Sequence, residues 1–180
     1  MPNPLLVLIL ALTAAARSLT AQARPAAPVR YEIAFPDRVH HEGEVTIRFA
    51  AVPAGPLRVE MARSSPGRYA LHEFAKNVYR VQATDPTGRA LTVTRLSPHA
   101  WEIRGHRGEV LLRYTLFADR ADGTYAGIDE TRAHLNIPAT FAYAPALATR
   151  PIEVTFRRPD PTWGIATQLQ PTGDAETFRA

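Results

Sequence analysis

Between Ser64 and Asn77 the chain gathers side chains that acid–base, nucleophilic and metal chemistry all use. A zinc-peptidase helix needs His-Glu-x-x-His, because the i and i+4 imidazoles then lie on one helical face beside the glutamate. His72-Glu73 has Lys76 at the second histidine position, where an ammonium would repel the cation. A second pair, His41-Glu42, has Val45 there. We therefore predict neither a metal ligand nor a catalytic residue in this chain.

The same stretch also offers a nucleophile in Ser64-Ser65, a base in His72 and an orienting acid in Glu73. The Gly-x-Ser-x-Gly elbow and the P-loop are absent from the sequence. A serine before Pro66-Gly67 is typical of a turn, where its hydroxyl bonds the nearby backbone. We expect a Pro-Gly turn, then one short helical turn over residues 70–76, and a strand from Val78.

Other candidate ligands are spread along the chain. The acidic loop from Asp119 to Glu130 lacks the alternating ligands of a calcium-binding EF-hand and is expected to be solvated. The pair His40-His41 is expected to form a solvated turn. Aromatic residues could stack on a sugar, although in alternating strands such residues are more often part of the core; these residues are Trp101, Tyr125 and Trp163.

The composition narrows the classes of protein. The 180 residues contain no cysteine, which excludes disulfides and thiolate sites, and the net charge of +4 comes almost entirely from scattered arginines. Lys76 is the only lysine. Without a run of basic residues, we expect no nucleic-acid partner.

Residues 1–23 resemble a signal peptide, with an apolar run from Leu5 to Ala16 and a small-x-small site at Ala21-Gln22-Ala23. The run is too short for a stable membrane anchor. We expect cleavage near Ala23 and export to the periplasm or the extracellular space. Residues 24–28 then form a lead-in, and residues 29–180 one domain.

The elements that must position the stretch from Ser64 to Asn77 are short strands. Apolar and polar residues alternate in Glu44–Ala50 and Glu109–Phe117, among others, and Pro-, Gly- and Asp-rich turns separate about ten such segments. Trp163–Leu169 is predicted to be the last strand. This spacing predicts an all-β domain, either an antiparallel β-sandwich or a saddle-like open sheet.

An ordered series of motifs gives a family resemblance. Pro66-Gly67-Arg68-Tyr69 followed by Glu73-Phe74-Ala75-Lys76-Asn77 resembles the Pro-Gly-x-Tyr and Glu-Phe-Ala-Arg-Asn of the M61 metallopeptidases, the glycyl aminopeptidase family. Trp101-Glu102-Ile103 and the segment Asp129–Asn136 are similar to later parts of the same N-terminal domain. The likeness extends over residues 29–180.

The resemblance implies a non-catalytic β domain that packs on a zinc-binding catalytic domain and helps to wall its substrate cleft. The family's zinc helix is not among these 180 residues, so zinc and the peptide substrate are expected only in that other domain, in cis or on a separately encoded chain. At the cleft or the domain interface we place five residues: Arg68, Tyr69, His72, Glu73 and Asn77.

Three alternatives remain open. In the first, these residues only stabilise their own turn: Glu73 pairs with Arg68 or Lys76, while Tyr69 and Phe74 belong to the core. In the second, the chain is a stand-alone secreted β-sandwich that binds peptide or glycan through an edge strand or an aromatic strip. In the third, it is a diverged pseudo-enzyme that assists a separate catalytic chain.

Overall fold

The computed structural model describes residues 26–180, and within them the chain is almost entirely strands and turns. The expected signal peptide lies outside the described residues. The strands are β1 (Val29–Ala34), β2 (Glu42–Phe49), β3 (Leu57–Glu60), β4 (Val78–Thr84), β5 (Thr92–Ser97), β6 (Ala100–Arg104), β7 (Val110–Phe117), β8 (Gly127–Ile128), β9 (Ala133–His134), β10 (Ile152–Arg157), β11 (Gln170–Pro171) and β12 (Thr177–Arg179). The helical turns are η1 (Arg38–His40), η2 (Phe74–Asn77), α1 (Ile137–Thr140) and η3 (Pro145–Leu147).

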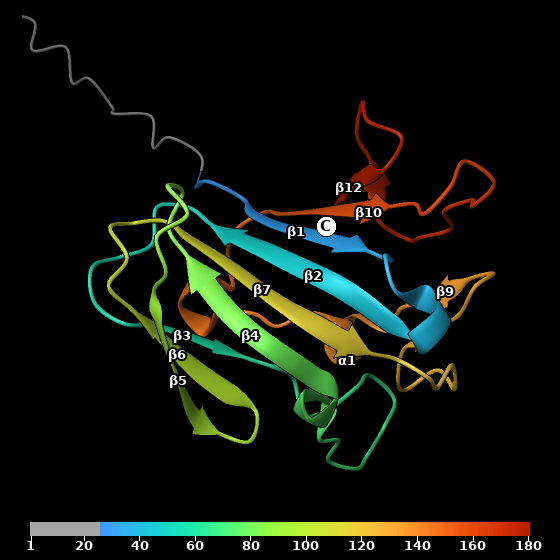
Figure 1. Ribbon diagram of the computed structural model, residues 1–180, viewed down its shortest axis with the longest axis horizontal. Helices are drawn as coiled ribbons and strands as arrows, with labels where there is room; N and C mark the ends of the chain where they lie inside the picture. The colour runs from blue at the N-terminus through green and yellow to red at the C-terminus, as the bar shows by residue number, and fades with distance from the viewer. Residues whose placement is uncertain (1–25) are drawn as a thin grey trace, which may run out of the picture.

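One large sheet dominates the molecule, in the order β11-β12-β10-β1-β2-β7-β4 (Figure 1). A second sheet, β3-β6-β5, packs against part of it, and β8 and β9 form a small two-stranded sheet. The all-β prediction is thus confirmed. The purely antiparallel arrangement is wrong at one place, because β1 pairs with β10 in parallel, Val29 opposite Ile152. A parallel pair of this kind joins strands far apart in sequence, which alternation within each strand does not reveal.

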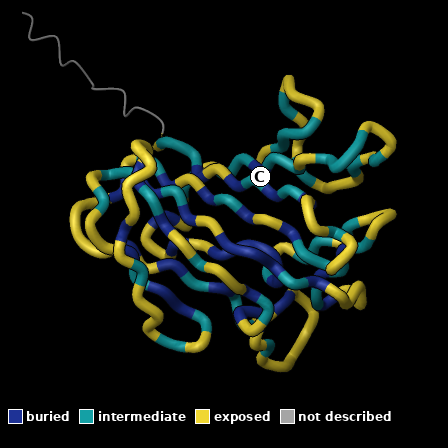
Figure 2. The backbone as a smooth tube through the Cα atoms, in the orientation of Figure 1, coloured by how far each residue is buried: buried dark blue, intermediate teal, exposed yellow. Residues whose placement is uncertain are grey.

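The core lies between the large sheet and the layer beneath it, as the buried segments of Figure 2 show. Strands β2 and β7 bury alternate residues because their side chains point to opposite faces. Under the centre of the large sheet the covering layer is not the second sheet but the segment 137–147. There the ring of Phe141 meets that of Tyr31 edge-on, with centroids 5.2 Å apart.

Two expected elements differ from the structure. The helical turn predicted over residues 70–76 is a 3-10 turn at Phe74–Asn77, and residues 70–73 form an irregular loop. It is short because only Phe74 and Ala75 are buried and anchor it to the core. The strand predicted at Trp163–Leu169 belongs to no sheet, and its burial alternates only from Trp163 to Ala166, because Thr167 is exposed. Within the described residues no helix has the length and apolar character to cross a bilayer.

Candidate functional site

The loop between β3 and η2, residues 61–73, carries most of the predicted site residues; we call it the Tyr69 loop. Pro66 and Gly67 occupy the central positions of a turn, in which the Arg68 N–H donates to the Ser65 carbonyl at 3.0 Å. Gly67 has φ of +75°, which suits the second central position of a type II turn. The His72 N–H donates to the Arg63 carbonyl at 2.9 Å and so closes the base of the loop.

The tip of the Tyr69 loop exposes two large apolar side chains. Tyr69 is 105% exposed and Leu71 is 71% exposed. The alternative in which Tyr69 belongs to the core is therefore wrong, whereas Phe74 is buried as that alternative expected. Exposed aromatic and aliphatic side chains on one loop are a feature of binding surfaces, where such residues act as anchors.

Three aromatic rings hold the base of the Tyr69 loop. His72 stacks on Phe74 with centroids 5.2 Å apart, and Tyr125 packs edge-on against both rings at 5.8 and 5.2 Å. Tyr125 comes from the polar loop between β7 and β8, residues 118–126. The cluster therefore joins two loops that are about fifty residues apart in sequence.

Two cations lie over the ring of Tyr125. The Lys76 ammonium is 5.3 Å from the ring centroid and the Arg120 guanidinium is 5.0 Å from it. The Arg68 guanidinium lies nearby, against Gly123. Arg120 is paired with Asp122 at 2.8 Å.

The charge of this surface is positive on balance. Glu73 accepts a hydrogen bond from the Arg63 guanidinium, so the expected pairing of Glu73 with Arg68 or Lys76 is wrong. In residues 26–180, Arg68 and Lys76 have no carboxylate within ion-pair distance. The surface thus combines two uncompensated cations with two exposed apolar side chains. Asn77, half-buried at the end of η2, lies beside the surface rather than at the loop tip.

Ser65, His72 and Glu73 do not form a catalytic triad. The buried Ser65 hydroxyl accepts a hydrogen bond from the Asn136 amide at 3.2 Å. The His72 Nε2 is buried, and no described residue hydrogen-bonds to it. Because Ser65 points to Asn136 and Glu73 to Arg63, the three groups cannot relay a proton.

Several other histidines and acids have structural partners. His40 donates to the Asp37 carboxylate at 2.6 Å, which raises the pKa of His40. His41 donates to the Ile128 carbonyl at 2.6 Å and links η1 to β8. In the acidic loop, backbone N–H groups of Tyr125 and Thr124 donate to Asp122 and lower the pKa of its carboxyl. The pKa of the Asp129 carboxyl is lowered first by the Thr131 hydroxyl bond and then by backbone N–H groups. Among the residues that the structure describes, no three His, Cys, Asp or Glu side chains gather as metal ligands.

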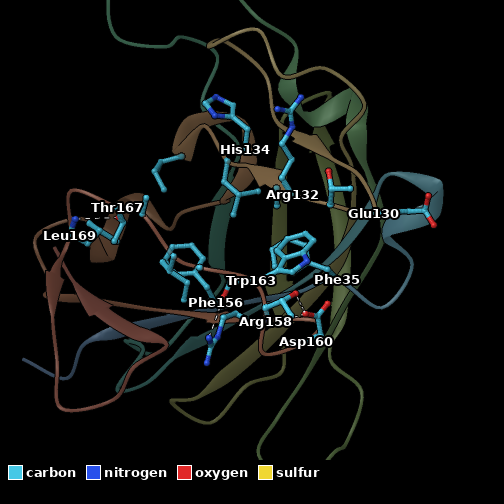
Figure 3. A pocket seen from close by; sticks show the side chains of 18 of the residues that line it. Phe35, Glu130, Arg132, His134, Phe156, Arg158, Asp160, Trp163, Thr167 and Leu169 are labelled. Carbon is cyan, nitrogen blue, oxygen red and sulfur yellow. Dashed lines mark hydrogen bonds between the residues drawn. The ribbon is translucent and has the colours of Figure 1, made fainter.

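A groove that the sequence reasoning missed lies between the β8–β9 hairpin and the segment 163–169 (Figure 3). Its volume is about 930 Å³. Phe35, Phe156 and Trp163 lie on one side in Figure 3, and Arg132 and His134 lie across from them. The sequence predicts a strand at Trp163–Leu169, whereas the structure places this segment, outside any sheet, along the groove.

The remaining tryptophan does not offer a stacking platform. Trp101 is buried in β6, with the Arg95 guanidinium 5.2 Å above its ring.

Comparisons with known proteins agree on one architecture. A family model described as the Peptidase M61 N-terminal domain matches residues 30–180. The chain is also similar to the crystal structure of an aminopeptidase N family protein from Idiomarina loihiensis, with a TM-score of 0.78 and 21% identity. That match covers 84% of this chain and 27% of the other, so this chain spans about a quarter of that protein's length. A comparison with curated protein sequences gives no match.

Proposed function

The chain belongs to the family of M61 peptidase N-terminal domains, and from this premise we propose that it is a non-catalytic domain that docks on a zinc-dependent peptidase domain. The family predicted from Pro66-Gly67-Arg68-Tyr69 and Glu73–Asn77 is confirmed by the match over residues 30–180. The docking role, the zinc of the partner and the walling of a substrate cleft are our proposal. The partner is a catalytic domain in cis or on a separate chain.

The observation that carries the proposal is the surface at the Tyr69 loop. Tyr69 and Leu71 gain little from folding, since their side chains stay in water. Their burial in a partner would release that apolar free energy, and Tyr is among the residues most often found as interface anchors. Arg68 precedes Tyr69 in the chain, and Lys76 lies over the Tyr125 ring at the base of the loop, which favours a partner surface with carboxylates around an apolar depression.

No step of peptide hydrolysis is assigned to this chain. The three residues closest to a catalytic set each contact another residue instead: Ser65 contacts Asn136, His72 stacks on Phe74, and Glu73 contacts Arg63. In our proposal zinc belongs to the partner domain, where it would activate the attacking water.

The test is association with an M61-type catalytic domain that carries His-Glu-x-x-His. We expect a complex in size-exclusion chromatography, and we expect Tyr69→Ala and Leu71→Ala to weaken its affinity by about tenfold each. Leu96→Ala is the matched control, because Leu96 is also an exposed aliphatic residue (49%) but lies on β5. Equal affinities for all three variants, or chelator-sensitive peptidase activity of this chain alone, would refute the proposal.

We further propose that the chain is exported after cleavage near Ala23, on the evidence of the apolar run Leu5–Ala16. N-terminal sequencing of the protein from a cell fraction tests this directly. A mature N-terminus close to Arg24 in the periplasm or the medium is expected. An intact Met1 in the cytoplasm would contradict it.

A further inference from the structure

The segment 163–169 has the sequence of a strand but has no strand partner. Trp163, Ile165 and Leu169 are half-buried, whereas Gly164, Ala166, Thr167 and Gln168 are exposed. Among residues 26–180, none of the backbone N–H or C=O groups from Gly164 to Gln168 bonds to another backbone group. An extended segment whose main-chain groups are free is a template for adding a strand.

A second free edge faces the same groove. Strand β9 pairs with β8 on one side, and no described strand pairs with its other side. Ala133, His134 and Leu135 line the groove together with residues 164–169. Main-chain donors and acceptors are therefore present on both walls of a groove of about 930 Å³.

The floor of the groove suits apolar side chains. Phe35 and Trp163 pack with centroids 5.6 Å apart, and Phe156, which also lines the groove, packs against Phe178 at 5.8 Å. The Arg158 guanidinium, which also lines the groove, is compensated, because it donates to Glu176 at 3.0 Å and to the Trp163 carbonyl at 3.2 Å. A ligand with apolar side chains would meet the rings of this floor, while Glu130, which has no ion-pair partner among the described residues, also lines the groove (Figure 3).

We propose that this groove binds a peptide in extended conformation, which adds a β-strand to the segment 164–168. Backbone hydrogen bonds to the segment supply binding energy that does not depend on the sequence of the peptide. Alternate apolar side chains of the peptide pack on Phe35, Phe156 and Trp163. The site lies apart from the Tyr69 loop in sequence and shares no residue with it. It goes beyond the proposed function, because it is argued from the unpaired main-chain groups of 164–168 and not from the Tyr69 loop.

The experiment uses this chain alone. The probe is a fluorescein-labelled peptide of about eight residues that alternates valine and threonine, with a lysine at each end for solubility; extended, it spans about 27 Å. We expect saturable binding by fluorescence anisotropy. The same peptide with N-methyl groups on alternate residues loses backbone donors, and we expect its affinity to fall by about tenfold or more.

Two proline variants make the test specific to the backbone. Ala166→Pro and Thr167→Pro each remove one N–H group that has no backbone partner in the described part of the free protein, so folding should be retained. In an extended chain successive N–H groups point to opposite sides. We therefore expect one variant to weaken peptide binding by about tenfold and the other to leave it nearly unchanged.

Three results would overturn the proposal: no saturable binding, equal binding of the N-methylated peptide, or peptide-free dimerisation through this groove. The last would show that a second copy, and not a peptide, completes the free edges. Each result is independent of docking through Tyr69 and Leu71, so failure here leaves that proposal intact.

Discussion

Tyr114 of β7 is the side chain that fastens the large sheet to the segment beneath it. Its hydroxyl donates to the Thr140 carbonyl at 2.7 Å and accepts the Ala142 N–H at 3.0 Å. All of these groups are buried. One phenol therefore satisfies two main-chain groups that have no access to water.

Replacement of this hydroxyl should be costly. We expect Tyr114→Phe to lower the free energy of unfolding by about 2–4 kcal/mol, because it leaves a buried carbonyl and a buried N–H without partners. Urea unfolding followed by circular dichroism measures this. Tyr31→Phe is the control. Tyr31 is also buried, but no hydrogen bond of its hydroxyl occurs among the described residues, so this substitution should lower the free energy of unfolding by no more than about 0.5 kcal/mol. Equal losses would refute the account.

Because of the same two tyrosines, we expect the stability of the folded protein to depend on pH in the alkaline range. Burial raises the pKa of Tyr31 from 10.0 to about 12, and burial also raises the pKa of Tyr114. A phenol that ionises first in the unfolded chain stabilises that chain, so stability is complete below pH 10 and falls as the pH rises toward 12. Thermal melts across this range should show the loss, and Tyr31→Phe should make it smaller. A slope that this substitution leaves unchanged would contradict the assignment.

Among the elements, the last strands of the large sheet depend on ion pairs across strands. Glu153 of β10 accepts from Arg30 of β1 at 2.8 Å and lies 3.4 Å from Arg179 of β12. The hydrogen bond from Arg30, then the two guanidinium charges, lower the pKa of Glu153. The glutamate thus joins three neighbouring strands.

These pairs should weaken in acid. A carboxyl with a lowered pKa in the folded state contributes stability above its unfolded pKa, and that contribution is lost as the pH falls through about 4.5 toward 3. We expect Glu153→Gln to flatten the decline of the melting temperature over this range. Glu130→Gln is the matched control, because Glu130 is exposed and has no ion-pair partner in the described chain. Identical profiles for the two variants would argue against a role for Glu153.

The polar loop between β7 and β8, which carries Tyr125 and Arg120, folds back tightly on Gly127 in β8. A Cβ atom there would lie 2.7 Å from the Ala121 Cβ and 2.8 Å from its backbone nitrogen. We expect Gly127→Ala to destabilise the protein by about 1–3 kcal/mol and to displace Tyr125 and Arg120. Gly164→Ala is the control, since nothing lies within 4 Å of a Cβ at that position. Chemical shifts of the loop and urea unfolding report both effects.

The sequence predicts where strands lie better than it predicts which segments pair with them. Alternation located β2 and β7 correctly, because each buries one face completely. It also suggested a strand at 163–169, where the pattern is real but the pairing is not, since alternation reports burial on one side and not hydrogen bonds on the edge. Glu73 accepts a hydrogen bond from Arg63, and His72 packs against Tyr125. No spacing rule predicts that Tyr125 lies beside residues some fifty positions earlier in the sequence.

At the scale of the whole molecule, the ends of the domain lie together. Val29 begins β1 opposite Ile152, and the Ala180 N–H donates to the Ile152 carbonyl at 3.2 Å. The Tyr69 loop, in contrast, follows β3 and precedes η2, at the end of the large sheet where β4 begins (Figure 1). The end of β12 and the Tyr69 loop are therefore two separate places on the surface of the domain.

The parallel pair of β1 and β10 can form only late in the synthesis of the chain. Arg30 and Glu153, which pair across these strands, are 123 positions apart. A ribosome adds about 5–20 residues per second, so the edge of β1 that pairs with β10 stays unpaired for roughly 6–25 s, until β10 has been synthesised. Throughout that interval the first strand is open to wrong partners, and the completed sheet is a late event in the life of each new chain.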